Sequence, residues 1–225
     1  MMNALTVTTS ALLFDMDGVL IDSMPAVERV WRAWAAEHGF DPDEVAARAH
    51  GRPSLTTVRE YLPNADHDLE NREIERRELA DVDGIAPLPG AIELLRSLPV
   101  ERWAIVTSCT LPLARARARA GGLPEPRLFI TADDVKQGKP GPEPYQTAAR
   151  GLGISPAQCI VVEDVDAGVA SGKAAGARVI ALATSLNPAK LRRAGADWVV
   201  ANCAALGAAL IDGELQITLA QPMEF

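Results

Sequence analysis

The sequence predicts an α/β fold with a doubly wound parallel sheet, and three observations support this prediction. Short apolar runs of strand length recur along the chain, and stretches with helical spacing separate most of them. The runs are continuously apolar, which is typical of strands covered on both faces, as in parallel sheets. The repeated strand–helix–strand order favours helices on both faces of the sheet. With 225 residues, of which 48% are hydrophobic, the chain is long enough for a large core.

Six apolar runs are predicted to be the strands of this sheet: residues 11–15, 103–108, 127–131, 159–164, 178–184 and 197–200. Five stretches are predicted to be its helices: residues 89–98, 111–122, 142–153, 166–176 and 187–196. The second of these helices carries Arg115, Arg117 and Arg119, which we interpret as a solvated helix face, with Arg117 pointing away from the other two. Residues 214–219 alternate polar and apolar side chains, which predicts an additional edge strand.

The segment that follows the first strand breaks this alternation. It begins with a helical pattern in which Val30, Trp31 and Trp34 share one face and Gly39 ends the helix. Three further helical segments follow without a strand pattern among them, around residues 42–50, 53–61 and 67–80. We therefore predict two domains: an α/β core formed by residues 1–20 and 86–225, and an all-helical inserted domain formed by residues 21–85.

The net charge of −8 is concentrated in the helical segment. Residues 22–83 contain 15 acidic and 8 basic side chains, which accounts for seven of the eight net negative charges. Nucleic acids and anionic lipid surfaces bind proteins mainly through Lys and Arg. The charge distribution therefore argues against a nucleic acid or a membrane surface as a partner.

Neither a membrane-spanning helix nor a secretion signal is expected. No apolar run approaches the roughly 18 residues that a membrane helix needs, and the first ten residues show neither a cationic region nor a cleavage pattern. Cys109, Cys159 and Cys203 are odd in number and widely spaced, which is typical neither of a disulfide framework nor of a thiolate metal site. These features favour a soluble cytoplasmic protein, and we expect a monomer or a weak dimer.

Polar side chains suited to chemistry follow several of the predicted strands. In doubly wound sheets, ligands bind beyond the carboxyl ends of the strands, so these residues are expected to meet at one edge. Clustered carboxylates repel one another unless they take up protons or share a cation, and an all-oxygen ligand set suits Mg²⁺. Magnesium together with a lysine and hydroxyl groups is suited to binding a phosphoryl group. The residues concerned are Asp15, Asp17, Thr107, Ser108, Lys139, Glu163 and Asp164.

Each of these residues also has a purely structural interpretation. The segment from Asp15 to Gly18 is typical of a strand-to-turn connection, and Thr107 or Ser108 would cap the helix that follows. The lysine would be a solvated loop residue, and the acidic pair would cap the next helix. The joint occurrence of these residues at successive strand ends favours a functional site instead.

Four segments together resemble the four motifs of the haloacid dehalogenase superfamily, in order and in spacing. They are FDMDGVLIDS at residues 14–23, VTS at 106–108, the Lys139–Pro140 pair, and VVEDVDAG at 161–168. The segment ITADDVKQGKPGPEPY, with the insert's DSMPAVERVWRAW and HGRPS, resembles the branch that contains glycerol-3-phosphatases, 2-deoxyglucose-6-phosphatases and bacterial sugar phosphatases. The resemblance extends from about Leu12 to Thr184 and implies a Rossmann-like core with a small helical cap domain.

The resemblance implies roles for the acidic residues. Asp15 would be the nucleophile that forms an aspartyl-phosphate, and Asp17 would be the general acid and then the general base. Mg²⁺ would be bound by Asp15, by the backbone carbonyl of Asp17 and by Asp164. Glu163 would lie nearby or bind the metal through water.

The resemblance also implies which groups bind the substrate. Thr107, the backbone amide of Ser108 and Lys139 would bind the phosphoryl oxygens. His50 and Arg52 occupy a cap loop that faces the active site in relatives, so we expect them to contact the leaving group. The alternative for these two residues is a helix end with a solvated arginine.

Val19 and Cys109 are among the positions that depart from the pattern of the family. Val19 stands where its phosphatases often have Thr and where phosphomutases also have Val, which slightly favours a mutase. Cys109 stands beside Ser108 where close relatives often have Gly or Ala. We expect this cysteine either to narrow the site or to be an exposed thiol that is open to oxidation.

From these observations we predict a Mg²⁺-dependent phosphomonoesterase that hydrolyses a small sugar or polyol phosphate, such as glycerol, hexitol or hexose phosphate. A β-phosphoglucomutase-like phosphotransferase is the main alternative, because it would share the core machinery. A receiver-type signalling domain is disfavoured by the helical insert and by the chain length. A dehalogenase is disfavoured because Asp17 and the acidic pair would serve a metal that its reaction does not need.

Overall fold

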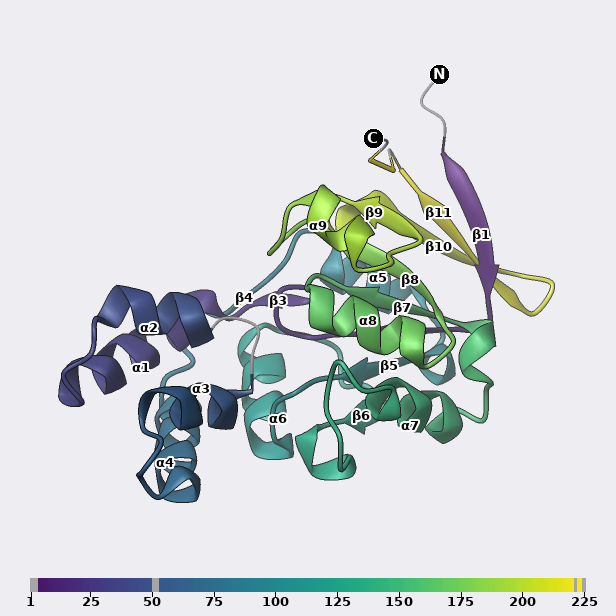
Figure 1. The fold of residues 1–225 in the computed structure, drawn as a ribbon. Coiled ribbons are helices and arrows are strands. Elements are labelled where there is room, and N and C mark those ends of the chain that lie inside the picture. The colour runs from purple at the N-terminus through teal and green to yellow at the C-terminus, as the bar shows by residue number, and fades with distance from the viewer. Residues whose placement is uncertain (1–3, 50–52, 221, 224–225) are drawn as a thin grey trace.

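The computed structural model describes residues 4–49, 53–220 and 222–223 of the chain. The centre of this part of the chain is a parallel sheet of six strands, which confirms the predicted fold class (Figure 1). The strands are β2 (Ala11–Phe14), β5 (Trp103–Val106), β6 (Phe129–Ile130), β7 (Cys159–Glu163), β8 (Arg178–Leu182) and β9 (Trp198–Val200). Their order is β6-β5-β2-β7-β8-β9, so β2 and β7 are neighbours at the centre.

Helices cover both faces of this sheet. They are α5 (Ala91–Ser97), α6 (Leu111–Ala120), α7 (Glu143–Gly151), α8 (Asp166–Ala174) and α9 (Pro188–Arg193). Leu12 and Phe14 of β2 share a core cluster with α5 and α6, whereas Ala11 and Leu13 share one with α7, α8 and α9. Successive side chains of the strand thus enter opposite cores, which explains why the strand sequences are continuously apolar. Short 3-10 helices lie in the connections: η1 (Val100–Arg102), η2 (Ala132–Asp134), η3 (Pro156–Gln158) and η4 (Cys203–Ala205).

A helical insert leaves the sheet after β2 and returns before α5. It comprises α1 (Met24–Glu37), α2 (Pro42–Ala49), α3 (Ser54–Tyr61) and α4 (His67–Ala80). The insert has its own apolar core, in which Trp34 and Ile74 are fully buried. The segments that enter and leave it pair as the short antiparallel strands β3 (Ile21–Asp22) and β4 (Ala86–Pro87). Figure 1 shows the insert at the left, at one end of the sheet domain.

A second, antiparallel sheet lies at the opposite end of the molecule from the insert (Figure 1). It consists of β1 (Leu5–Thr9), β10 (Leu206–Ile211) and β11 (Glu214–Leu219), in the order β1-β11-β10. The prediction of an edge strand at residues 214–219 is wrong, because β11 is the central strand of this sheet. Leu215, Ile217 and Leu219 are buried in the core shared with α5, which produces the alternation seen in the sequence. Alternation shows that one face is buried but does not identify the neighbouring strands.

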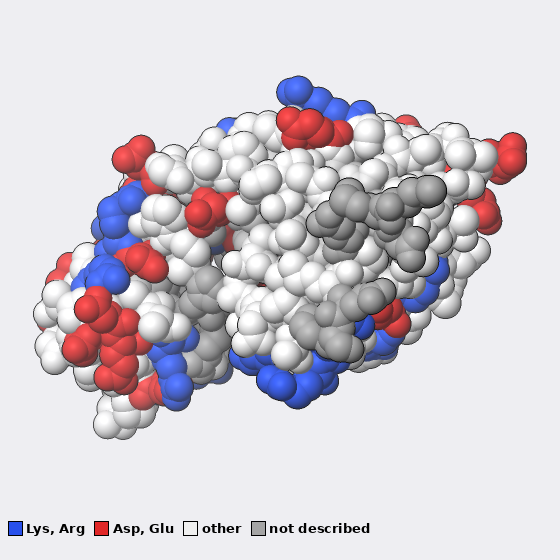
Figure 2. All heavy atoms as spheres, turned by 90° about the horizontal axis from the view of Figure 1, so that it is seen from above, with Lys and Arg blue, Asp and Glu red and all other residues white. Residues whose placement is uncertain are grey.

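Many of the charges of the insert are paired with one another. Ion pairs join Arg32 to Asp43 and Arg77 to Glu37, and acidic and basic side chains lie side by side over the insert at the left of Figure 2. Such exposed pairs contribute little to stability, typically below about 1 kcal/mol. Within the described ranges, no helix has both the length and the hydropathy needed to cross a membrane.

Candidate active site

Three carboxylates meet at the carboxyl ends of the two central strands. Asp15 follows β2 directly, Glu163 is the last residue of β7, and Asp164 follows it. Because β2 and β7 are parallel neighbours, their ends place these side chains together, and one oxygen of each lies within 4.8 Å of the others. Glu163 is fully buried and Asp164 is 2% exposed. The structure therefore brings together three of the acidic residues that the sequence suggested.

Two glycines allow this close approach. A Cβ atom on Gly18 would lie 2.1 Å from Oδ2 of Asp164, and the backbone of Gly18 has a φ of +83°, which L side chains rarely adopt. A Cβ atom on Gly168 of α8 would lie 1.9 Å from the carboxyl group of Glu163. The motif glycines are therefore required by the space that the carboxylates occupy.

Lys139 provides the positive charge at this cluster. Its Nζ donates hydrogen bonds to Oδ1 of Asp15, to Oε1 of Glu163 at 2.7 Å and to the carbonyl of Val106 at 3.1 Å. The hydroxyl of Tyr145 donates to the same oxygen of Glu163 at 2.6 Å, and its ring centroid lies 5.2 Å from Nζ. The lysine side chain is only 8% exposed, so the solvated-loop interpretation is wrong.

The pKa values of the cluster reflect burial and mutual repulsion. Burial raises the pKa of Asp15 well above its usual value, the charges of Glu163 and Asp164 add to this effect, and Lys139 opposes it. Burial and the charge of Glu163 raise the pKa of Asp164 to about 7. Burial lowers the pKa of Lys139, but the charges of Asp15 and Glu163 outweigh it, so this pKa is raised overall. The ammonium group of Lys139 thus pairs directly with two of the three carboxylates, those of Asp15 and Glu163.

The cluster has the properties of a site for a hard divalent cation. The Oδ1 atom of Asp164 is buried and has no hydrogen-bond partner among the described residues. Buried polar atoms without a partner are rare in native proteins, and a bound ion would satisfy this one. Carboxylate oxygens are the ligands that Mg²⁺ prefers. The residues present therefore fit a magnesium ion bound by Asp15 and Asp164, with Glu163 beside them.

Thr107 and Ser108 lie at the end of β5, next to β2 in the sheet. Thr107 is buried, its amide donates to the carbonyl of Ile130 at 2.9 Å, and its Oγ1 accepts from the amide of Cys109 at 3.2 Å. Ser108 is exposed. Neither residue is the N-cap of α6, because that position is occupied by Thr110. The helix-cap interpretation of the pair is therefore wrong.

The side chain of Asp17 is directed towards helix α6. Its Oδ1 accepts a hydrogen bond from Nη1 of Arg117 at 3.0 Å, and the thiol of Cys109 donates to its Oδ2 at 3.4 Å. The side chain of Asp17 is 26% exposed, whereas that of Arg117 is 7% exposed. The interpretation of the arginine run as a solvated face is therefore wrong for Arg117.

Sequence reasoning missed three residues that contact the site. Arg117 has a signal in the sequence, because helical spacing places it on the face that Leu113 and Ala114 bury. Tyr145 shares a segment with Lys139, but its spacing alone does not place its hydroxyl on Glu163. A hydrogen bond from Ser185 acts to lower the pKa of Asp164, and no motif marked that serine. His50 and Arg52, which we expected to contact the leaving group, lie outside the described residues.

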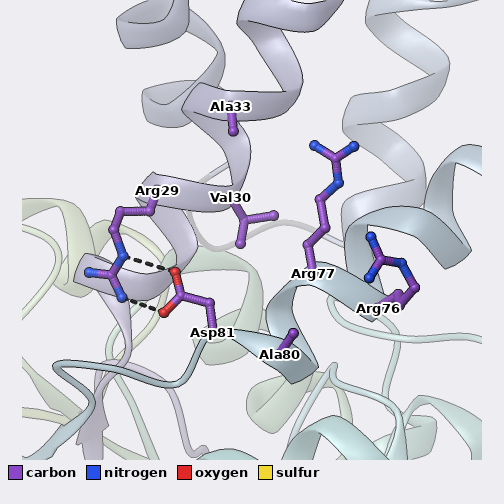
Figure 3. A pocket seen from close by; sticks show the side chains of 7 residues that line it. All are labelled: Arg29, Val30, Ala33, Arg76, Arg77, Ala80 and Asp81. Carbon is purple, nitrogen blue, oxygen red and sulfur yellow. Dashed lines mark hydrogen bonds and ion pairs between the residues drawn. The ribbon is translucent and has the colours of Figure 1, made fainter.

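A separate pocket lies within the insert, between α1 and α4 (Figure 3). Its lining residues are Arg29, Val30, Ala33, Arg76, Arg77, Ala80 and Asp81. Two hydrogen bonds join Arg29 to Asp81, at 2.9 and 2.7 Å, as Figure 3 shows. Arg76 and Arg77 both donate hydrogen bonds to the carboxylate of Glu73. Because its guanidinium groups already have carboxylate partners, this pocket is a poor candidate for binding an anion.

The amino-acid sequence was compared with models of known protein families. A family model for the haloacid dehalogenase-like hydrolases matches residues 9–176. The chain belongs to this family. The four matching motifs identified in the sequence are thus those of a haloacid dehalogenase-like hydrolase, and the resemblance is confirmed.

Individual relatives of this hydrolase include phosphatases. It is 49% identical to hexitol phosphatase A of Escherichia coli (strain K12) over 175 residues, which cover 76% of this chain and 81% of that protein. It is 36% identical to glycerol-1-phosphate phosphohydrolase 2 of Saccharomyces cerevisiae over 214 residues, covering 88% and 84%. Among solved structures, CbbY from Rhodobacter sphaeroides in complex with phosphate matches with a TM-score of 0.74 and 25% identity, covering 87% and 95%.

Proposed function

We propose that this protein is a Mg²⁺-dependent phosphatase that hydrolyses small sugar or polyol phosphates through an aspartyl-phosphate. The observation that carries this proposal is the cluster of Asp15, Glu163 and Asp164 around Lys139, with the unpartnered buried Oδ1 of Asp164. The similarity to hexitol phosphatase A, at 49% identity, supports the substrate class. The phosphate bound by the CbbY structure supports a phosphoryl site in this fold.

We assign the two chemical steps to two aspartates. In the first step, a carboxylate oxygen of Asp15 attacks phosphorus, the bond from phosphorus to the sugar oxygen breaks, and Asp17 gives that oxygen a proton. In the second step, Asp17 takes a proton from water, the water oxygen attacks phosphorus, and inorganic phosphate leaves Asp15. Lys139 fixes the orientation of Asp15 through its Oδ1.

Charge neutralisation is the second requirement of the reaction. Bound Mg²⁺ would supply positive charge that keeps the buried carboxylates ionised and offsets the charge of the phosphoryl oxygens. Lys139 contributes a permanent ammonium group to the same region, because its raised pKa keeps it protonated at neutral pH. We assign Thr107 and the amide of Ser108 to the phosphoryl oxygens, since both follow β5 beside Asp15.

We propose that the helical insert, residues 21–85, acts as a cap domain over this edge of the sheet. The insert joins the core through the paired segments β3 and β4, and β3 begins six residues after Asp15. His50 and Arg52 remain our candidates for contacts to the leaving group. A cap that closes over the site would exclude water and would contact the sugar or polyol part of the substrate.

A phosphate-release assay tests this function. Purified protein is given a panel of hexitol, glycerol and hexose phosphates, with Mg²⁺ or with EDTA. We expect phosphate to be released in the presence of Mg²⁺ and not in the presence of EDTA. In Asp15→Asn we expect the rate of release to fall roughly a thousandfold or more. Asp212→Asn is the matched control, because Asp212 is exposed and its φ of 51° suits asparagine.

Three outcomes would contradict the proposal. Turnover that persists in EDTA would remove the metal from the mechanism. Unchanged turnover in Asp15→Asn would remove the nucleophile. Isomerisation of glucose 1-phosphate that requires a bisphosphate primer, without net phosphate release, would establish the mutase alternative.

A further inference from the structure

Arg117 is a buried cation within the core domain. Its side chain is 7% exposed, and it shares the buried face of α6 with Leu113, Ala114 and Ala118. Removing an arginine from water costs several kcal/mol unless its charge is paired and its N–H groups are hydrogen-bonded. The partners of this guanidinium therefore determine why an arginine stands on an apolar face.

The guanidinium has two carboxylate partners. Its Nη1 donates to Oδ1 of Asp17 at 3.0 Å, and its Nη2 lies 3.4 Å from Oε1 of Glu78. Glu78 is itself 8% exposed. Burial raises the pKa of Glu78 while Arg117 opposes this rise, so the two side chains depend on each other for charge balance.

These partners come from different parts of the chain. Asp17 follows β2 of the sheet, Arg117 is on α6, and Glu78 is on α4 of the insert. Besides the ion pair between Arg117 and Glu78, a hydrogen bond joins α4 to the start of α6, from the hydroxyl of Thr110, which precedes α6, to Glu75 of α4. Arg117 thus connects the docked insert to the aspartate that we assign to proton transfer.

Cys109 completes the surroundings of Asp17. Its sulfur lies 3.4 Å from Oδ2 of Asp17 and 3.3 Å from Nη1 of Arg117. Both carboxylate oxygens of Asp17 therefore have a donor, and the side chain is held in one orientation. Arg117 is thus the cation paired with Asp17, whereas Lys139 is paired with Asp15 and Glu163.

We propose that Arg117 is a positioning residue for Asp17, and that Glu78 of the insert holds Arg117 in place. The inference rests on the proposed function, because it concerns the aspartate assigned to proton transfer. Docking of the insert and orientation of the proton donor are then coupled through one guanidinium group. The substrate does not need to touch Arg117 for this effect.

The experiment compares two substrates that differ in how much they need a proton donor. A hexitol phosphate has a poor leaving group that must be protonated, whereas 4-nitrophenyl phosphate has a good leaving group that needs little protonation. For Arg117→Lys we expect kcat to fall roughly tenfold or more on the hexitol phosphate, with KM nearly unchanged and a much smaller fall on 4-nitrophenyl phosphate. Arg119→Lys, on the exposed face of the same helix, should leave both activities unchanged.

Two further variants separate positioning from a general effect on folding. In an Asp17→Asn background, Arg117→Lys should cause no additional loss, because its effect passes through Asp17. Glu78→Gln leaves the guanidinium in the protein and should give the same substrate-dependent loss, to a smaller extent. This variant keeps the proposal testable if Arg117→Lys does not fold.

The outcomes distinguish this inference from the proposed function. Equal losses on both substrates, or a further loss in the Asp17→Asn background, would overturn the positioning role. An unchanged ratio of the two activities in Glu78→Gln would overturn the coupling to the insert. Absence of phosphate release by the wild-type protein would instead overturn the proposed function itself.

Discussion

The Oδ1 atom of Asp164 is buried without a hydrogen-bond partner among the described residues, and its carboxyl group lies beside two others. Burial and the charge of Glu163 raise its pKa to about 7. A raised carboxyl pKa means that the group destabilises the folded state at any pH above its pKa in the unfolded chain. The penalty is complete once the pH exceeds its pKa in the folded protein. In the absence of metal, Asp164 is therefore a destabilising residue that we expect to be retained for binding a cation.

Replacing Asp164 by Asn should stabilise the metal-free protein. Above pH 7 the charge penalty is fully present in the wild type, so we expect Asp164→Asn to be more stable by about 1 to 3 kcal/mol in EDTA. As the pH falls through 7 the wild-type carboxyl takes up a proton, and the difference should shrink. Thermal unfolding in EDTA at pH 8 and pH 5.5 measures both effects.

The same variant should lose its response to magnesium. Wild-type protein should melt at a higher temperature with Mg²⁺ than with EDTA, because the ion binds the folded state. Asp164→Asn should show little of this shift, while Asp212→Asn should show all of it. A full Mg²⁺ shift in Asp164→Asn would contradict our assignment of this residue to the metal.

The cysteines should react slowly in the folded protein. Burial raises the pKa of Cys159 to about 11 and that of Cys203 to about 12, and burial and the charge of Asp17 raise that of Cys109 further. Alkylation requires the thiolate. We expect iodoacetamide at pH 8 to label the native protein much more slowly than the urea-unfolded protein, as measured by mass spectrometry. Rapid labelling of native Cys109 would instead support the alternative of an exposed reactive thiol.

At the scale of single elements, the sequence located most helices and strands because their periodicity is local. The predicted strand at 159–164 and the predicted helix at 67–80 correspond to β7 and α4. Local periodicity did not reveal why helix α6 carries a buried arginine. Charge suggested a solvated helix, but its 3.6-residue period puts Arg117 on the buried face, and only the neighbouring Asp17 and Glu78 explain a cation there.

Helix α8 illustrates how an element sets the position of a carboxylate in the cluster. Gly168 of this helix lies against the carboxyl group of Glu163, where an added Cβ would be 1.9 Å away. We expect Gly168→Ala to cost about 1 to 3 kcal/mol of stability and to lower activity, because helix and carboxylate cannot both keep their places. Denaturant unfolding and phosphate release measure these effects.

Gly207 of β10 supplies the control for this substitution. An added Cβ there would meet its nearest neighbour, Thr218, at 3.7 Å, which is an ordinary contact. Gly207→Ala should therefore change neither stability nor activity appreciably. Equal effects at positions 168 and 207 would show that the contact with Glu163 is not the cause.

At the scale of the whole molecule, the parallel sheet lies between two parts of different kinds. The helical insert is at one end of the parallel sheet and the second sheet is at the other, as Figure 1 shows. Ile217 of the second sheet is fully buried in the core shared with α5. The second sheet therefore supports the core without contributing a residue to the carboxylate cluster.

Weakening the second sheet should separate stability from activity. Ile217→Ala removes buried methyl groups, so we expect a loss of about 2 to 5 kcal/mol in the free energy of unfolding. At temperatures where the variant is folded, KM and kcat should stay close to the wild-type values. Thr218→Ala, which alters the less buried face of β11, is the control. A large change in KM for Ile217→Ala would contradict the separation.

The sequence by itself determined the parallel sheet, the helical insert and the meeting of Asp15, Glu163 and Asp164. These features follow from local periodicity and from the rule that parallel strands end at the same edge. The tertiary structure alone decided that β11 is a central strand, that Tyr145 binds Glu163 and that Arg117 is buried between Asp17 and the insert. These contacts depend on which surfaces of distant segments meet, and a one-dimensional pattern records only that a surface is covered.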